Sequence, residues 1–281
     1  MISQLPGASV RAALVVAMVL TPSLLLPEAD PQITDAIVLM ALFAALFVFI
    51  EYGSAYPSLV EFRGAPPINR VRFGVMFATL MLIAIALDAG RSDALLSRLL
   101  LAVGVLLGHA TDFPLSPVRL MMWLLPEGTT FAQAQQFRAA AGLAYLVSLV
   151  GLTLFAILIR LRGWPSASGS FNVWINLPTF DPTAGSDVVR QLNRDGAVNI
   201  SLGLLLPYLT PPLALFVGRN YEVSVLDSPL MLTWTMTLWA FLPASLFLRG
   251  IAMRRLALMI SQKRRRLTLV DGAADPAFLP A

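Results

Sequence analysis

The sequence predicts an all-α, polytopic transmembrane helical bundle with about six full crossings and one re-entrant or irregular segment, residues 94–126. The first observation behind this prediction is composition: 57% of the residues are hydrophobic, 13% are charged, and the mean hydropathy is +0.76. A soluble domain has about a quarter charged residues. The second observation is that long apolar runs cover most of the chain and approach the roughly 20 residues that cross a bilayer.

Prolines and charged residues divide the chain into seven apolar segments, because proline removes a backbone donor and a charged side chain is costly in lipid. We expect the first segment to be a retained helix, since no small-x-small cleavage site follows it. The segments are 8–27, 35–56, 71–88, 94–126, 138–159, 198–217 and 229–250.

Segment 94–126 differs from the other six. Its apolar run 99–107 ends in a polar stretch, and the second apolar piece, 120–125, is too short to span. We expect it to enter and leave on the periplasmic side as two half-helices, because both chain ends are predicted to be cytoplasmic. An eight-crossing arrangement, or seven crossings with one misplaced arginine loop, is the alternative.

Arginine-rich segments set the predicted topology, because cytoplasmic loops are enriched in basic residues. The composition favours a bacterial inner membrane, with both termini in the cytoplasm. Cysteines placed at Ser92, Thr129 and Ser224 should then be labelled from the periplasm. The basic segments contain Arg63, Arg70 and Arg72, then Arg160, Arg162, Arg190 and Arg194, and finally Arg249, Arg254, Arg255, Lys263, Arg264, Arg265 and Arg266.

Two domains are predicted: a transmembrane domain over 1–250 and a basic cytoplasmic tail over 251–281. The first includes a cytoplasmic loop, 163–197, expected to lie on the membrane surface with aromatic side chains in the interface and a short amphipathic helix near 186–195. The tail is expected to bind anionic lipid headgroups or simply to orient the last helix. Its basic run is Lys263, Arg264, Arg265 and Arg266.

Two residue pairs in segment 94–126 are candidate sites. His109 and Asp112 would share one helical face and could relay a proton, or they could mark only a turn at the membrane surface. Gly104 and Gly108 form a small-x-x-x-small pattern that lets another helix approach closely. The partner helix could belong to this chain or to another subunit.

Three prolines, Pro207, Pro211 and Pro212, interrupt the sixth predicted helix. A broken helix leaves backbone carbonyls that could coordinate an ion or solute, whereas a simple kink would have no such role. The acidic residues nearest the apolar runs, Glu51 and Asp88, fall at segment ends. The lack of a carboxylate in mid-bilayer argues against proton- or sodium-coupled transport.

The sequence indicates no enzyme motif. The chain has no cysteine and one histidine, which excludes disulfides, thiolate metal sites and bis-histidine haem. We expect no cofactor, no metal and no nucleic-acid partner. The leading hypothesis is a non-catalytic accessory or assembly subunit of a larger membrane complex. The alternatives are a small-solute transporter or channel using the proline-containing helix, and a lipid-handling enzyme using His109 and Asp112.

Overall fold

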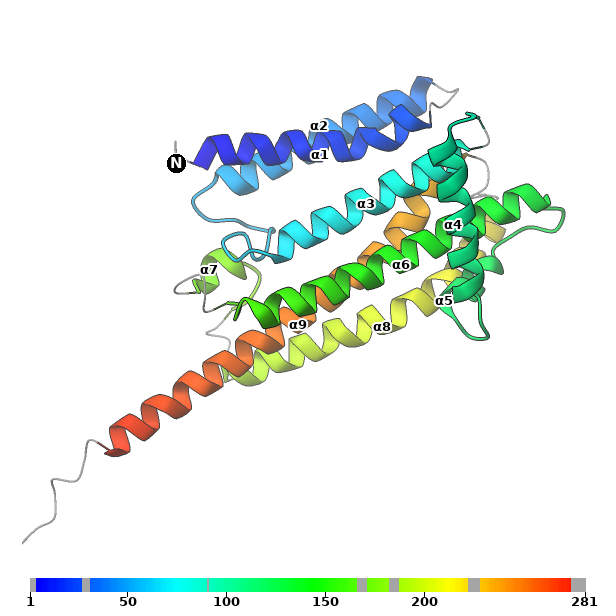
Figure 1. Cartoon of the computed structure of the whole chain (residues 1–281). Coiled ribbons are helices and arrows are strands. Elements are labelled where there is room, and N and C mark those ends of the chain that lie inside the picture. Colours follow the sequence, from blue (N-terminus) through cyan, green and yellow to red (C-terminus); the bar gives the residue numbers. More distant parts are fainter. Residues whose placement is uncertain are drawn as a thin grey trace, which may run out of the picture.

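The computed structural model describes residues 4–26, 31–89, 91–165, 171–181, 187–221 and 228–273, and the regular structure of these residues is all helical. Six helices are long and apolar enough to cross a membrane, which confirms the predicted all-helical fold and is consistent with a multi-pass bundle. They are α1 (Leu5–Leu25), α2 (Pro31–Gly53), α3 (Ile68–Asp88), α6 (Phe131–Leu161), α8 (Val188–Tyr221) and α9 (Pro229–Ala273) (Figure 1).

The long helices alternate in direction, so α1, α3 and α8 begin at the same end of the bundle at which α2 and α6 end (Figure 1). We call this the basic end, because most of the chain's 20 basic residues lie in its loops and adjoining helical turns. Asp88, Asp93, Asp112 and Glu127 lie at the opposite end. Arg91, Arg98, Arg119 and Arg138 lie there too, so the described residues of the opposite end are close to neutral, whereas those of the basic end have a large excess of positive charge.

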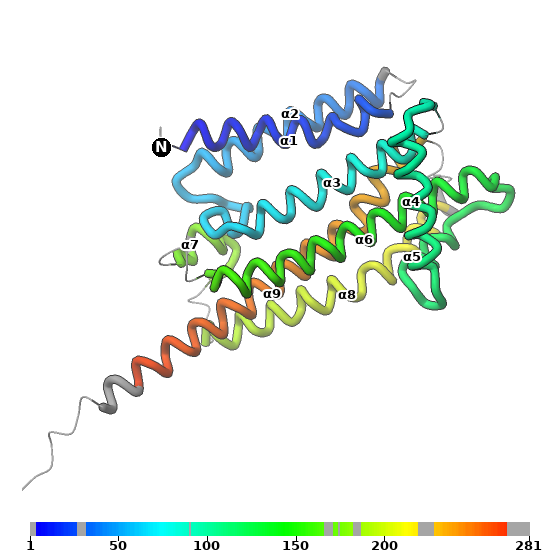
Figure 2. Tube along the Cα trace, in the orientation of Figure 1, coloured from blue at the N-terminus to red at the C-terminus, as the bar shows by residue number. Residues whose placement is uncertain are grey.

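Helix α9 is 45 residues long, or about 68 Å at 1.5 Å per residue. This length exceeds the roughly 30 Å of a bilayer core. Helix α9 therefore continues past the basic end and beyond the other helices (Figure 2). The predicted boundary between residues 250 and 251 falls inside this continuous helix, and residues 274–281 of the predicted tail lie outside the described residues.

The irregular segment 94–126 forms two shorter helices, α4 (Leu95–Thr111) and α5 (Pro117–Met122). Helix α4 runs across the opposite end of the bundle and packs on α6, rather than entering and leaving as a re-entrant pair (Figure 1). Ser92 and Thr129 flank this segment at the opposite end, as the topology required, whereas Ser224 lies outside the described residues.

Glycines allow α4 to approach α6 at the level of the backbone. A Cβ atom built on Gly142 would lie 2.6 Å from the Cα of Gly108, and one on Gly104 would lie 3.0 Å from the Cβ of Ala139. The predicted small-residue pattern is thus used for packing within this chain. Helices α8 and α9 meet in the same way, since a Cβ on Gly250 would lie 2.7 Å from the carbonyl oxygen of Gly196.

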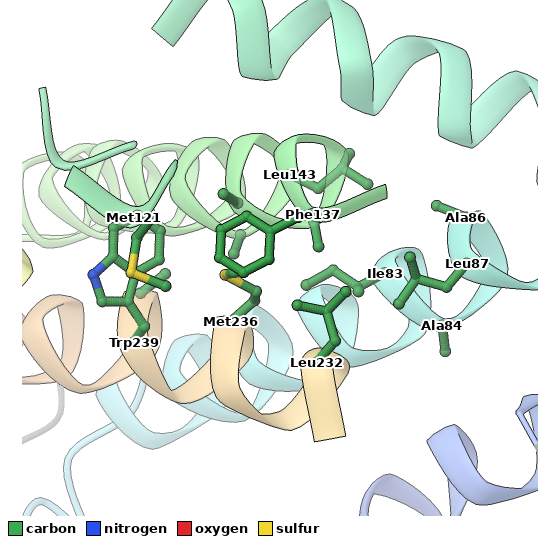
Figure 3. Close-up of a cluster of buried hydrophobic side chains, with 14 of the residues drawn as sticks. Ile83, Ala84, Ala86, Leu87, Met121, Phe137, Leu143, Leu232, Met236 and Trp239 are labelled. Atoms are coloured by element: carbon green, nitrogen blue, oxygen red, sulfur yellow. The ribbon is translucent and has the colours of Figure 1, made fainter. Parts of the chain in front are cut away.

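One large hydrophobic core joins α3, α5, α6 and α9 near the opposite end. Figure 3 shows the ring of Phe137 facing Met236, and Met121 of α5 lying beside Trp239. All four side chains are buried. This core fixes α9 against α3 and α6; α1 reaches it at Leu25 and the following Leu26, and the described residues of α2 lie outside it.

Loops cover the basic end and pack on one another. Trp164 is buried, with its ring centroid 6.1 Å from that of Phe62 and 6.3 Å from that of Phe171. The short helix α7 (Val173–Asn176) belongs to this cover, and its Asn176 accepts hydrogen bonds from two backbone N–H groups of the loop 54–67.

The predicted surface loop 163–197 therefore differs from its expected form. Of its described aromatic residues, Trp164 and Phe171 pack against protein instead of dipping into the membrane interface. Residues 188–195 form the first turns of α8 rather than a separate amphipathic helix. The physical reason is that loop 54–67 offers an apolar partner, Phe62, which the linear sequence does not place nearby.

Candidate functional site

A cavity of about 1200 Å³ opens at the basic end. Residues from the first half of α1, the end of α2, the loop 59–66, the start of α3 and the middle of α9 line it. We call it the basic cavity, because five arginines contribute to its lining. They are Arg11, Arg63, Arg70, Arg72 and Arg249.

The carboxylate of Glu51 shapes the loop that forms one wall of the cavity. Glu51 is buried and accepts hydrogen bonds from the backbone N–H groups of Ser58 at 3.1 Å, Leu59 at 3.1 Å and Val60 at 2.9 Å. The sequence predicted that the Glu51 carboxylate would lie at a segment end, within reach of water. The folded loop instead supplies its hydrogen bonds, as buried charge requires, and the chain turns back sharply after α2.

Arg63 closes the same loop through backbone carbonyls. Its guanidinium donates to the carbonyl oxygens of Glu51 at 2.6 Å, Ser54 at 2.8 Å and Ala55 at 3.0 Å. These bonds satisfy most of its donors, but a carbonyl oxygen does not neutralise its positive charge. Arg63 thus adds positive charge to the cavity wall as well as order to the loop.

Glu61 lines the cavity, and Arg249 donates hydrogen bonds to both of its carboxylate oxygens. Arg249 donates from Nε to Oε2 at 2.6 Å and from Nη2 to Oε1 at 2.7 Å, which is bidentate geometry. Its Nη1 also donates to Oδ1 of Asn199 at 3.1 Å, and the Thr179 hydroxyl donates to Oε1 of Glu61. This network links the loop 54–67 to α8 and α9.

Arg72 extends from the first turns of α3 into the cavity. Its Nη2 donates to the carbonyl oxygen of Ser245 at 3.1 Å, while its Nε is buried and has no acceptor among the described residues. A buried polar group without a hydrogen bond is unfavourable by roughly 1–3 kcal/mol, and more when charged. Arg72, which lines the cavity, therefore keeps one buried donor that has no acceptor among the described residues.

The other two arginines lie nearer solvent. Arg11 stacks over the ring of Tyr52, with its guanidinium carbon 4.7 Å from the ring centroid, and Arg70 is exposed. Within the described residues, neither arginine forms an ion pair, and the same holds for Arg63 and Arg72. In this part of the chain, four positive charges therefore line one cavity without an opposing carboxylate of their own.

Apolar side chains form the remaining wall. They come from α1, α2, α3 and α9, and they continue the lining from the arginines toward the middle of the bundle. They include Val10, Leu14, Val15, Val48, Phe73, Phe241 and Leu246. The cavity thus has a cationic region and an apolar region, which is the arrangement that an anionic amphiphile requires.

The predicted polar pair lies at the opposite end of the bundle. Asp112 follows α4 and forms ion pairs with Arg119 and, at 3.5 Å, with Nη2 of Arg138. His109 is exposed, and its described contact with Asp112 is a backbone hydrogen bond. The structure therefore brings Asp112 to two arginines rather than to the histidine side chain.

The three prolines lie within an unbroken helix, in contrast to the interruption suggested by the sequence. Pro211 has no N–H for the carbonyl of Pro207, and Nε1 of Trp239 donates to that oxygen at 3.4 Å. Thr210 donates to the carbonyl of Leu206 at 2.7 Å. Neighbouring groups thus use the carbonyls near Pro207, beside a small cavity of about 180 Å³ between α6, α8 and α9.

The basic run Lys263–Arg266 lies on the exposed part of α9 beyond the bundle, away from the cavity. Arg264 pairs with Asp187, the residue before α8. This hydrogen bond lowers the pKa of Asp187 below its ordinary value. The run is therefore exposed at the surface, where headgroups could reach it, and it is separate from the basic cavity.

The sequence alone did not reveal the basic cavity. In the sequence, Arg63, Arg70 and Arg72 indicated only which side of the membrane their loop occupies. Arg72 and Arg249 nevertheless each fall inside a predicted apolar segment, 71–88 or 229–250. An arginine at such a position is a signal for a buried polar site. Which arginines face one another depends on how the helices associate.

Comparison with known proteins adds no functional assignment: no family model, no curated protein and no solved structure matches this chain.

Proposed function

We propose that the protein is a multi-pass membrane protein that binds an anionic amphiphile in the basic cavity. The headgroup would contact the arginines, and the tail would lie against the apolar wall. The observation that supports this proposal is that, among the described residues, four of the five lining arginines have no carboxylate partner, while Glu61 is engaged by Arg249.

Electrostatics favours such a ligand. Like charges gathered in a partly desolvated cavity repel one another, and the attraction of an opposite charge is stronger there than in water. Charge-assisted hydrogen bonds from arginine to phosphate or carboxylate oxygens are about twice as strong as neutral ones. A ligand with an anionic head would thus stabilise the folded protein, and an apolar tail would add burial.

The test compares two amphiphiles that differ in charge. We expect an alkyl phosphate to bind the purified protein at least about tenfold more tightly than the alkylphosphocholine of the same chain length, measured by calorimetry in non-ionic detergent. Replacing the two exposed arginines, Arg11→Gln with Arg70→Gln, should weaken alkyl phosphate binding by a similar factor. Equal affinities for the two amphiphiles would contradict the proposal.

The matched control removes the same charge from the same end of the molecule. The double variant Arg265→Gln with Arg266→Gln changes two exposed arginines on α9, outside the cavity. We expect it to bind the alkyl phosphate as the unmodified protein does. Loss of binding in this variant instead would assign headgroup recognition to the basic run of α9.

We further propose that the basic end faces the cytoplasm of a bacterial inner membrane, because arginine-rich segments remain on that side. The naturally cysteine-free chain allows a direct test. A single cysteine at Ser92 or Thr129 should be labelled by an impermeant reagent added outside, and one at Gln262 should be labelled only after the cells are opened. The reverse pattern would refute this orientation.

An accessory or assembly subunit is a second proposal. It is favoured by the second half of α9, which exposes Leu258 beside the bundle and Leu267 beyond it, together with four basic side chains. Stable co-purification with other membrane proteins, lost when α9 is shortened after Leu256, would support it. The transporter and enzyme hypotheses lose support, because Trp239 donates to the carbonyl of Pro207 and two arginines engage Asp112.

A further inference from the structure

The cavity geometry points to a lipid whose headgroup contains two linked phosphoryl groups, and we propose this diphosphate-headed class as the ligand. The inference rests on the proposed function and narrows it to one headgroup chemistry. Three features favour it: the amount of uncompensated charge, the depth at which the arginines lie, and the unused donor of Arg72.

The charge in the cavity exceeds what one phosphodiester can balance. A phosphodiester has a single negative charge, whereas four lining arginines have no carboxylate partner within the described ranges of the chain. A phosphomonoester contributes about −1.5 to −2 near neutral pH, and a second phosphoryl group adds to this. A diphosphate head therefore compensates the arginines more completely than the common singly charged phospholipid headgroups do.

The arginines lie at two depths along the cavity. Arg72 lies two residues after Arg70 on α3, about 3 Å further along the helix axis, and it is half-buried. Arg70 precedes it and is exposed, and Arg11 is likewise exposed on α1. An anionic group at one depth would leave the arginines at the other depth uncompensated. Two phosphoryl groups joined by one oxygen extend along the cavity and reach both.

The donor atoms of Arg72 suit the inner phosphoryl group. Its Nη2 is used by the carbonyl of Ser245, but its Nε has no acceptor among the described residues and is shielded from solvent. Because this Nε has almost no accessible surface, the guanidinium must turn toward the cavity for a phosphoryl oxygen to accept its hydrogen bond. Because Arg72 lies next to the apolar wall that includes Phe73 and Phe241, the inner phosphoryl group is the one attached to the lipid chain.

The cavity is large enough for both parts of the ligand. Its volume of about 1200 Å³ exceeds the roughly 300–1,000 Å³ that is usual for small-molecule sites. The apolar wall, formed mainly by valine, leucine and phenylalanine, contacts the first part of the tail. We therefore infer that tight binding requires the tail as well as the diphosphate.

Calorimetry with three probes tests the inference: a prenyl diphosphate, the prenyl monophosphate of the same chain length, and inorganic pyrophosphate, each in metal-free detergent solution. We expect the prenyl diphosphate to bind at least about tenfold more tightly than either other probe. Equal binding of monophosphate and diphosphate would overturn the inference while leaving the proposed function intact. Pyrophosphate binding as tightly as the prenyl diphosphate would overturn it as well, and would assign the site to a soluble anion.

Variants separate the role of Arg72 from general charge. Arg72→Lys keeps the charge but loses the planar donor set, and we expect it to lose at least about tenfold in diphosphate affinity and less in monophosphate affinity. Arg70→Gln, an exposed change that leaves the Ser245 contact intact, should reduce diphosphate preference without loss of folding. Arg98→Gln at the opposite end is the control. Unchanged diphosphate preference in both cavity variants would overturn the inference.

Discussion

Helix α4 meets α6 at glycines, whereas α1 is separated from α3 and α9 by the basic cavity. At the first contact, Gly108 and Gly142 bring two backbones together. At the second, α1 packs through Met18 and Val19 only along the half that is remote from the basic end, in a cluster with Leu80 of α3. The two helices diverge toward the basic end (Figure 2). Glycines accompany the close contact between α4 and α6, and arginine side chains line the space between α1, α3 and α9.

The largest expected effect lies at the glycine contact. Gly142→Leu would force side-chain atoms onto the backbone of Gly108, because even a Cβ atom at residue 142 would lie 2.6 Å from the Gly108 Cα. We expect unfolding to become easier by about 3 kcal/mol or more, at the upper limit for overpacking, seen as a lower thermal midpoint in detergent. Gly74→Leu is the control, because a Cβ there meets nothing within 4 Å. Similar thermal midpoints for the two variants would contradict the view that α4 and α6 are packed closely at these glycines.

The next effect concerns the ion pair beside the cavity. Glu61→Gln leaves Arg249 without its carboxylate, and we expect a loss of about 1–2 kcal/mol. This is less than the roughly 3–5 kcal/mol of fully buried pairs, because the Arg249 side chain is 27% exposed. Thermal unfolding measures the loss, and Glu127→Gln, an exposed change at the opposite end, should not alter it. An unchanged midpoint in Glu61→Gln would show that the network does not stabilise the basic end.

A cavity-filling substitution tests whether α1 is loosely packed where it faces the basic cavity. Leu14→Trp adds volume where α1 faces the basic cavity, so the free energy of unfolding should change by only about 0.5 kcal/mol. Binding of the alkyl phosphate should be lost, because the tail region is occupied. Leu24→Trp, at an exposed position of the same helix, should affect neither quantity. Strong destabilisation by Leu14→Trp would mean that α1 is packed as closely as α4.

The smallest effect is expected at the exposed pair Asp187–Arg264, which joins α8 to the projecting part of α9. Because the hydrogen bond from Arg264 lowers the pKa of Asp187, the contact is present above the ordinary carboxyl pKa and is lost as the pH falls through the lowered value. Hydrogen exchange over residues 258–268 should therefore be faster in Asp187→Asn than in the unmodified protein at neutral pH. The difference should vanish in acid, and a persistent difference would contradict it.

Much of the fold follows from local sequence. Apolar length predicted the six helices that are long enough to cross a membrane, and the short second piece of 94–126 predicted that this segment would be irregular, because a piece of that length cannot span lipid. The orientation of α4 did not follow from the sequence. It depends on Gly142, which lies on α6 and has no local pattern linking it to Gly108.

The candidate site followed much less from the sequence. Arg63, Arg70 and Arg72 are close in the chain, but Arg11 and Arg249 join them only after α1 and α9 have packed. The same applies to Glu61 and Arg249, a pair separated by 188 positions. Charge along the chain predicts the side of the membrane, and it does not predict which charges share a cavity.

The sequence by itself determined that this chain is a helical, multi-pass membrane protein with most of its positive charge at one end, because hydrophobic length and charge position are local properties. Only the tertiary structure decided which arginines of the described chain line one cavity and which of them pairs with Glu61, because that depends on helix contacts set by glycines and buried side chains far apart in the sequence. The proposed amphiphile site is therefore a property of the tertiary structure.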